Sequence, residues 1–194
     1  MAQRCCLPLE WPPLLHRSGQ APAVSGARKF RAPRVTIIFG MAHASIVWLP
    51  DGGLSVLAHC EYPNGLALSP DERIMYVANT RSSQYIQATK LDAAGNMVGR
   101  SIFADLNEGS EPGTPDGSKV DSVGRVYCTG PGGIWVIAPD GKRLGIIEWP
   151  EQAVNFAFGG PDLRTLLCCA HTSVYMLRVE VPGNPHPWYK SRGQ

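Results

Sequence analysis

One short motif occurs twice in this chain, about fifty residues apart, and it constrains the fold more than any other feature. The first copy reads Pro63-Asn64-Gly65 and the second reads Pro115-Asp116-Gly117. In each copy a Pro–Asx–Gly turn precedes alternating apolar residues, the pattern of a β-strand with one buried face. The same structural unit therefore presents an amide oxygen in one copy and a carboxylate in the other. A repeat protein assembles a metal site in this way.

From residue 37 onward, short apolar runs alternate with turns. The 21 Gly and 17 Pro of the chain punctuate these runs, which favours strands and tight turns over helices. Strands are predicted at residues 44–49, 54–58, 64–69, 74–78, 85–91, 98–103, 117–120, 126–129, 134–138, 144–147, 154–158, 165–170 and 173–179. Four strands in a unit of roughly 40–50 residues is the period of a propeller blade. We therefore predict an all-β fold, a partial β-propeller of about three to four blades over residues 37–183.

The two ends of the chain have a different character. Residues 1–36 carry six basic side chains against Glu10 alone, together with five prolines and no sustained periodicity. We predict a poorly ordered or non-homologous segment there and a loose tail over residues 184–194. The net charge of +5 in residues 1–36 leaves −3 for the remainder, since the total is +2. No nucleic-acid partner is therefore expected. No apolar run approaches the length of a membrane span, so we expect no membrane association and a cytoplasmic location.

Propeller geometry gives the Asx residues a shared position. The residue just before the innermost strand of each blade points toward the central channel, where several blades can converge on one ion. Asn64, Asp116 and Asn155 are spaced 52 and 39 residues apart, one blade in each case. Taken singly, Asn64 and Asp116 also fit a simple turn. Together they favour a shared site, while Asn155 fits either a pocket lining or a strand cap.

Other chemistries find no support in the sequence. It has no Gly-x-Ser-x-Gly elbow, no His-Glu-x-x-His pair and no Walker loop. The six cysteines lack metal-type spacing and are expected to be mainly small buried residues. Cys168 and Cys169 fall within one predicted strand, so their side chains are expected on opposite faces.

Several longer segments now support a family resemblance. They follow one another across residues 44–183 and comprise Pro63–Glu72, Met75–Thr80, Pro115–Gly117, Val120-Asp121, Gly132–Val136, Pro139–Gly141 and Asn155–Gly160. Their order and spacing resemble the gluconolactonase, regucalcin and senescence-marker-protein family. The resemblance implies a six-bladed propeller that hydrolyses sugar or related lactones with one divalent cation, Ca²⁺ first, with Zn²⁺, Mn²⁺ or Mg²⁺ as alternatives. It also implies that Asn64 and Asp116 bind the cation and that Asp116 acts as the general acid/base.

The chain departs from the family pattern in one ligand. The family holds its ion with a further glutamate in a Glu-Gly-Pro context, and no such run exists here. We therefore expect impaired lactonase activity in this chain. The alternatives are a non-catalytic propeller fragment that serves as an interaction module and an incomplete gene product. An incomplete propeller exposes a strand edge, so self-association through that open blade edge is expected as well.

Overall fold

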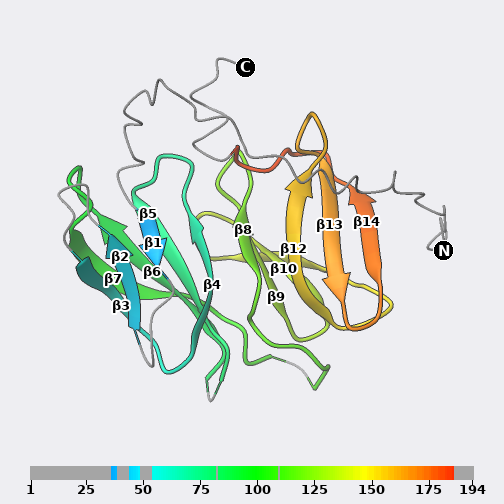
Figure 1. Cartoon of the computed structure of the whole chain (residues 1–194). Coiled ribbons are helices and arrows are strands. Elements are labelled where there is room, and N and C mark those ends of the chain that lie inside the picture. Colours follow the sequence, from blue (N-terminus) through cyan, green and yellow to red (C-terminus); the bar gives the residue numbers. More distant parts are fainter. Residues whose placement is uncertain (1–35, 39–43, 49–53, 82, 109, 186–194) are drawn as a thin grey trace, which may run out of the picture. The chain divides into compact units, whose positions relative to one another are not determined.

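The computed structural model describes residues 36–38, 44–48, 54–81, 83–108 and 110–185, all within the compact unit Ala32–Gln194. Most of the two predicted end segments lies outside the described residues. Within the described ranges the secondary structure is entirely β, as predicted, and forms four antiparallel sheets (Figure 1). No helix long and apolar enough to cross a membrane occurs in this part of the chain.

Each sheet is a meander in which consecutive strands pair. The first sheet has the order β1-β2-β3 and the second the order β4-β5-β6-β7. The third runs β8-β9-β10-β11 and the fourth β12-β13-β14. The strands are β1 (Thr36–Ile38), β2 (Ala44–Trp48), β3 (Leu54–His59), β4 (Pro63–Leu68), β5 (Ile74–Asn79), β6 (Tyr85–Leu91), β7 (Met97–Asp105), β8 (Ser118–Val120), β9 (Val126–Gly130), β10 (Gly133–Ile137), β11 (Arg143–Ile147), β12 (Ala153–Gly159), β13 (Thr165–Ala170) and β14 (Val174–Arg178).

The strand predictions hold closely. β6 and β13 have the predicted bounds, and the other predicted strands differ from theirs by only one or two residues at an end. β1 was not predicted, because a run of three residues gives no readable alternation. It pairs with β2 and extends the first sheet to three strands.

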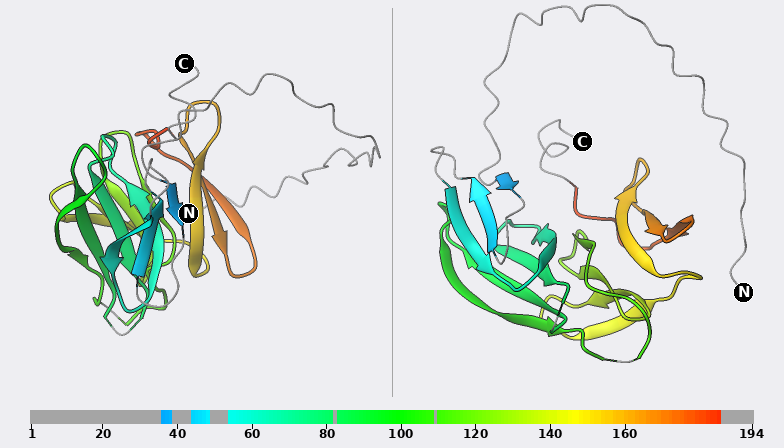
Figure 2. Two further views of the ribbon diagram at one scale, coloured as in Figure 1. Left: turned by 60° about the vertical axis from the view of Figure 1, so that its left-hand side comes forward. Right: turned by 60° about the horizontal axis from the view of Figure 1, so that its bottom comes forward.

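Figure 2 shows the β4–β7, β8–β11 and β12–β14 sheets following one another. Apolar side chains pack between these neighbouring sheets. Trp135 lies between the second and third sheets, 2% exposed, and donates its Nε1–H to the Pro131 carbonyl at 2.9 Å. The same cluster contains Tyr76, Ala78, Ile86, Ala88, Val126 and Cys128. A second cluster joins the third and fourth sheets and contains Tyr127, Ile134, Phe156, Leu166 and Cys168. Each interior sheet is thus covered on both faces, as in a propeller.

Two details concern predictions made from the sequence. Cys168 is fully buried and Cys169 is exposed, which confirms that the pair points to opposite faces of its strand. The first residue of the predicted tail is held in place, because the Asn184 amide donates to the Val120 carbonyl at 2.9 Å. Next to it, Gly183 forms a bridge with Asp121.

Candidate metal and catalytic site

Asn64 and Asp116 come together in the structure. Asn64 lies near the start of β4, and Asp116 lies two residues before β8, the inner strand of the next sheet. The Asn64 side chain forms a hydrogen bond with the Asp116 carboxylate. Both residues are partly buried. An amide oxygen and a carboxylate from successive sheets therefore share one location.

Glycines next to these residues allow the inner strands to approach each other closely. A Cβ atom added to Gly65 would lie 1.9 Å from the Asp116 carbonyl oxygen and 2.8 Å from the Ser118 nitrogen. One added to Gly117 would lie 2.5 Å from the Asn155 Oδ1. No side chain fits at those distances, so the Asx–Gly pairs of the motif have a steric function beyond making a turn. They let each inner strand pack against the next.

Two threonines fix the backbone that carries Asp116. The Asp116 amide donates to Thr129 Oγ1 at 2.9 Å, and that hydroxyl donates to the Thr114 carbonyl at 3.0 Å. Thr80 of the preceding sheet donates to the Pro115 carbonyl at 2.7 Å. The sequence analysis did not identify these two hydrogen bonds, and their only signal in the sequence is a threonine after β5 and another within β9. Together they hold both the carbonyl and the amide of the Pro115–Asp116 peptide bond in place.

Burial and charge act in opposite directions on Asp116. Burial raises the pKa of its carboxyl group, while the hydrogen bond from Asn64 and the charge of Lys119 lower it. Lys119 itself is partly buried, and desolvation lowers its pKa. Its Nζ donates to the Ser118 carbonyl at 2.9 Å and lies 5.5 Å from the centre of the Phe156 ring. A carboxylate with a raised pKa beside a cation suits proton transfer.

Asn155 lies in the same region, but its position along its strand differs from the positions of Asn64 and Asp116 along theirs. Pairing aligns Asn155 with Cys169 on β13, whereas Leu66 pairs with Val77 and Ser118 with Cys128. Counting along these ladders matches Asn155 to Gly65 and Gly117, one residue beyond Asn64 and Asp116. The turn between β12 and β13 accounts for the offset, because the paired residues Phe158 and Leu166 are eight positions apart in sequence, whereas the equivalent Leu68 and Met75 are seven. The Asn155 Oδ1 nevertheless lies against Gly117 and accepts from the Phe156 amide at 2.8 Å.

The side chains at this site supply only some of the ligands that a hard cation needs. Carboxylate and amide oxygens are ligands that Ca²⁺ and Mg²⁺ prefer. Asp116 supplies one carboxylate, and Asn64 supplies one amide oxygen. Among the described residues, no three or more His, Cys, Asp or Glu side chains are grouped so that they could hold a metal ion. Oxygen atoms of water, of substrate or of neighbouring amide and carbonyl groups would complete the coordination.

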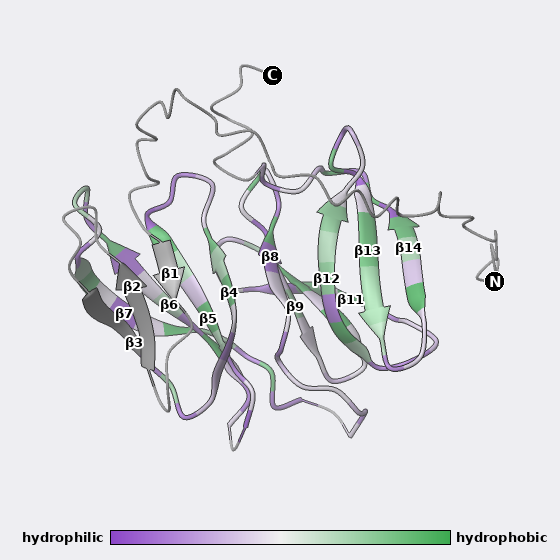
Figure 3. Ribbon diagram, in the orientation of Figure 1, coloured by the Kyte–Doolittle hydropathy of each residue, from purple (hydrophilic) through white to green (hydrophobic). Residues whose placement is uncertain are grey.

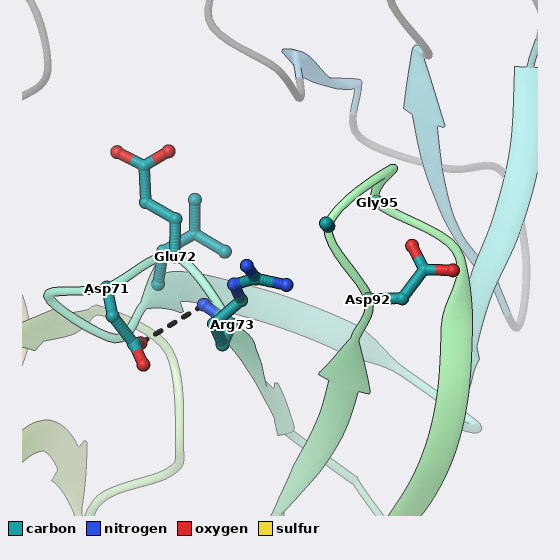
Figure 4. A pocket seen from close by; sticks show the side chains of 7 residues that line it. Asp71, Glu72, Arg73, Asp92 and Gly95 are labelled. Carbon is teal, nitrogen blue, oxygen red and sulfur yellow. Dashed lines mark hydrogen bonds between the residues drawn. The ribbon is translucent and has the colours of Figure 1, made fainter.

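A shallow pocket lies elsewhere and does not share this chemistry. It is lined by the turns after β4 and after β6 and includes Asp71, Glu72, Arg73, Asp92 and Gly95 (Figure 4). Asp71 accepts from the Arg73 amide at 3.1 Å, and Asp92 accepts from the Ala94 amide at 2.8 Å. Both carboxylates therefore close their own turns. The pocket lies at the far end of β4 from Asn64.

With this geometry established, comparison with known proteins identifies the family. The profile described as the SMP-30/Gluconolactonase/LRE-like region matches residues 35–172, well over half of the chain. The chain belongs to this family. Its β-propeller class, predicted above, is thereby confirmed, because solved members of the family superpose on it.

Three relatives show the extent of the likeness. The gluconolactonase of Zymomonas mobilis is 36% identical over 141 residues, covering 69% of this chain and 40% of that protein. A gluconolactonase of Xanthomonas campestris with a solved structure is 33% identical with a TM-score of 0.62, covering 73% of this chain and 46% of the other. Regucalcin from Agrobacterium tumefaciens, described as a calcium-binding protein, is 25% identical with a TM-score of 0.61 and is 55% covered. The chain spans about half the length of these relatives.

Proposed function

We propose that this chain carries part of the active site of a metal-dependent lactonase for sugar or related lactones. The observation that carries the proposal is the contact between Asn64 and Asp116 on two successive inner strands, within a chain similar to gluconolactonases. Asn64 and Asp116 would hold one divalent cation, Ca²⁺ by donor preference and by likeness to regucalcin. When bound, the cation supplies Lewis-acid polarisation of the lactone carbonyl.

The residues of the chain then have separate roles. Asp116 accepts the proton of the attacking water and returns a proton to the ring oxygen as the lactone opens to a hydroxy acid. Asn64 orients the Asp116 carboxylate through their hydrogen bond. Lys119 favours the ionised carboxylate, because its positive charge lowers the Asp116 pKa. Asn155 would line the substrate pocket from β12.

We expect this activity to be weak in the chain by itself. With one carboxylate at the site, the charge of a divalent cation is only half neutralised, so affinity is reduced. Cation binding is therefore the more sensitive property to test. A ligand that binds only the native state raises the melting temperature by mass action.

The test is thermal unfolding of the purified chain with and without Ca²⁺, Mn²⁺ or Zn²⁺, followed by proton release from a sugar lactone. We expect a cation-dependent rise in melting temperature that Asp116→Ala abolishes. Asp140→Ala is the matched control, because Asp140 occupies the same Pro-Asp-Gly tripeptide in an exposed turn. Loss of the shift in both variants, or its retention in Asp116→Ala, contradicts the proposed site. Ready lactone turnover by the unmodified chain contradicts the expected impairment.

A further inference from the structure

Lys119 places a positive charge beside the candidate site. It is partly buried on β8 and close enough to Asp116 for each charge to act on the other. Its side chain faces β12, because the Lys119 Nζ lies 5.5 Å from the centre of the Phe156 ring. Figure 3 shows the inner strand β8 beside the largely apolar β12, and the Gly117 amide donates to the Val154 carbonyl at 3.3 Å. The ammonium group therefore lies between two inner strands.

The ammonium group of Lys119 has more hydrogen-bond donors than the protein uses. An ammonium group carries three N–H donors. One of them donates to the Ser118 carbonyl at 2.9 Å. Among the described residues, no second acceptor and no carboxylate at ion-pair distance accompanies this group. A partly buried cation is costly unless it is paired, so its two other donors suit an anionic ligand.

Asn155 adds polar groups from the neighbouring strand. Its Oδ1 accepts from the Phe156 amide at 2.8 Å and lies against Gly117. The side-chain amide also has two N–H donors, and no described residue accepts a hydrogen bond from them. Asn155 is exposed, so these donors are accessible to a small molecule. Lys119 and Asn155 therefore offer N–H groups from β8 and β12 to one set of anionic oxygens.

Lactone hydrolysis itself creates an anion at this position. A sugar lactone is uncharged, whereas the hydroxy acid that it yields is ionised at neutral pH. The new carboxylate forms at the carbonyl carbon attacked by the water that Asp116 deprotonates, and it therefore forms beside a second negative charge. A cation close to Asp116 offsets this repulsion. A charged substituent at the far end of the substrate would need its cation elsewhere.

We propose that Lys119 binds the carboxylate of the hydroxy acid produced by lactone opening, with the Asn155 amide as a second donor. This inference rests on the proposed function, in which Lys119 acts only on the Asp116 carboxylate. It adds a group that contacts the reacting molecule. The site then binds sugar-acid anions, and the product inhibits the reaction.

The test is trace acetylation of the purified chain, followed by mass spectrometry of its lysine-containing peptides. The probes are D-gluconate, which carries a carboxylate, and D-glucitol, which has a hydroxymethyl group in its place. Both are added at the same free Ca²⁺ concentration, because carboxylates bind Ca²⁺ themselves. Saturating gluconate should reduce acetylation of Lys119 about threefold or more, and glucitol should leave it unchanged. Lys90, an exposed lysine of β6, should react equally in all samples.

Lys119→Met removes the charge and keeps an apolar side chain against Phe156. The apparent affinity for gluconate, measured from the melting temperature at increasing gluconate, should be roughly tenfold weaker in this variant. Lys119→Arg should restore most of it. Lys90→Met is the matched control for net charge and should leave the affinity unchanged. The melting shift produced by Ca²⁺ alone should persist in Lys119→Met at mildly alkaline pH, because Lys119 is not a proposed ligand.

The Ca²⁺ effect separates failure of this inference from failure of the lactonase proposal. A Ca²⁺-dependent melting shift without protection of Lys119 by gluconate overturns the role of Lys119 and leaves the cation site. Protection without a Ca²⁺ shift supports the carboxylate contact and contradicts a metal-dependent lactonase. Absence of both effects overturns both proposals. Equal protection by glucitol, or an unchanged affinity for gluconate in Lys119→Met, also overturns the inference.

Discussion

Replacing Gly65 by alanine should separate the two halves of the candidate site. The added Cβ would lie 1.9 Å from the Asp116 carbonyl oxygen, 2.7 Å from Ser118 Oγ and 2.8 Å from the Ser118 nitrogen. Two of these neighbours are backbone atoms of the next sheet, so no rotamer change relieves the overlap. Real Cβ contacts essentially never fall below 3.0 Å, so β4 and the Asp116 segment must part by at least 1.1 Å, the difference between 3.0 and 1.9 Å.

A displacement of this size has two measurable effects. Overpacking of this kind costs about 1–3 kcal/mol of unfolding free energy, and loss of the Asn64–Asp116 contact adds to it. Cation affinity should fall because two ligands that must share one ion no longer meet. Urea denaturation measures the first effect, and the cation-dependent shift in melting temperature measures the second.

The matched control is Gly99→Ala, since an added Cβ at Gly99 of β7 has nothing within 4 Å. That substitution should be neutral or slightly stabilising, because it restricts the unfolded chain without a clash. If Gly65→Ala is as stable as Gly99→Ala and shows the same cation shift, close approach of the inner strands does not build the site.

Three further predictions concern the Asp116 carboxyl group, the core around Trp135 and the hydrogen bonds of Glu151. Asn64→Leu should diminish the cation-dependent melting shift, because it removes one proposed ligand, and what remains of the shift should begin at a higher pH than in the wild type, because the Asp116 pKa rises without the Asn64 hydrogen bond. Trp135→Ala should cost roughly 3–5 kcal/mol in urea denaturation, since it empties the core between two sheets, and Trp135→Phe should cost clearly less. Hydrogen bonds from the Thr172 amide, Tyr175 and Ser173 lower the pKa of Glu151 from 4.5 to about 2. Because the folded pKa is depressed, this stabilisation is complete above about pH 5 and is lost as the pH falls toward 2. The stability gap between wild type and Glu151→Gln should shrink over that range and should be absent if Glu151 does not hold the turn.

The sequence indicated the fold well because turns here have strong chemical signals. Pro–Asx–Gly and related turns bound most strands, and alternation between them is clear, which is why β6 and β13 have the predicted limits. The short β1 lacks both signals. Asn64 and Asp116 do lie close together, as the regular spacing of whole blades indicated, while their roles in a site stay a prediction. The part of Asn155 in the site stays a prediction, although its Oδ1 does lie against Gly117, next to Asp116.

The networks of side-chain hydrogen bonds could not be predicted from the sequence, for a different reason. The contacts of Glu151 with residues 172, 173 and 175 join segments more than twenty residues apart, and none of the groups is unusual in its own segment. The same holds for the Thr129 hydroxyl, which accepts a hydrogen bond from the Asp116 amide thirteen residues away. Such contacts depend on how far one segment is shifted along its neighbour, and hydrophobic periodicity does not specify that shift.

The meander topology has a consequence for synthesis on the ribosome. All strands of the β4–β7 sheet exist once Asp105 has been made, yet the residues that the structure describes against the face with Tyr76 and Ala78 come mainly from β8, β9 and β10 of the next sheet. That sheet ends at Ile147, 42 residues later by subtraction of 105 from 147. At about 5–20 residues per second, a finished sheet waits roughly 2–8 s with one apolar face in water. Translation speed over this stretch therefore sets how long each nascent chain is open to chaperones or to a neighbouring chain.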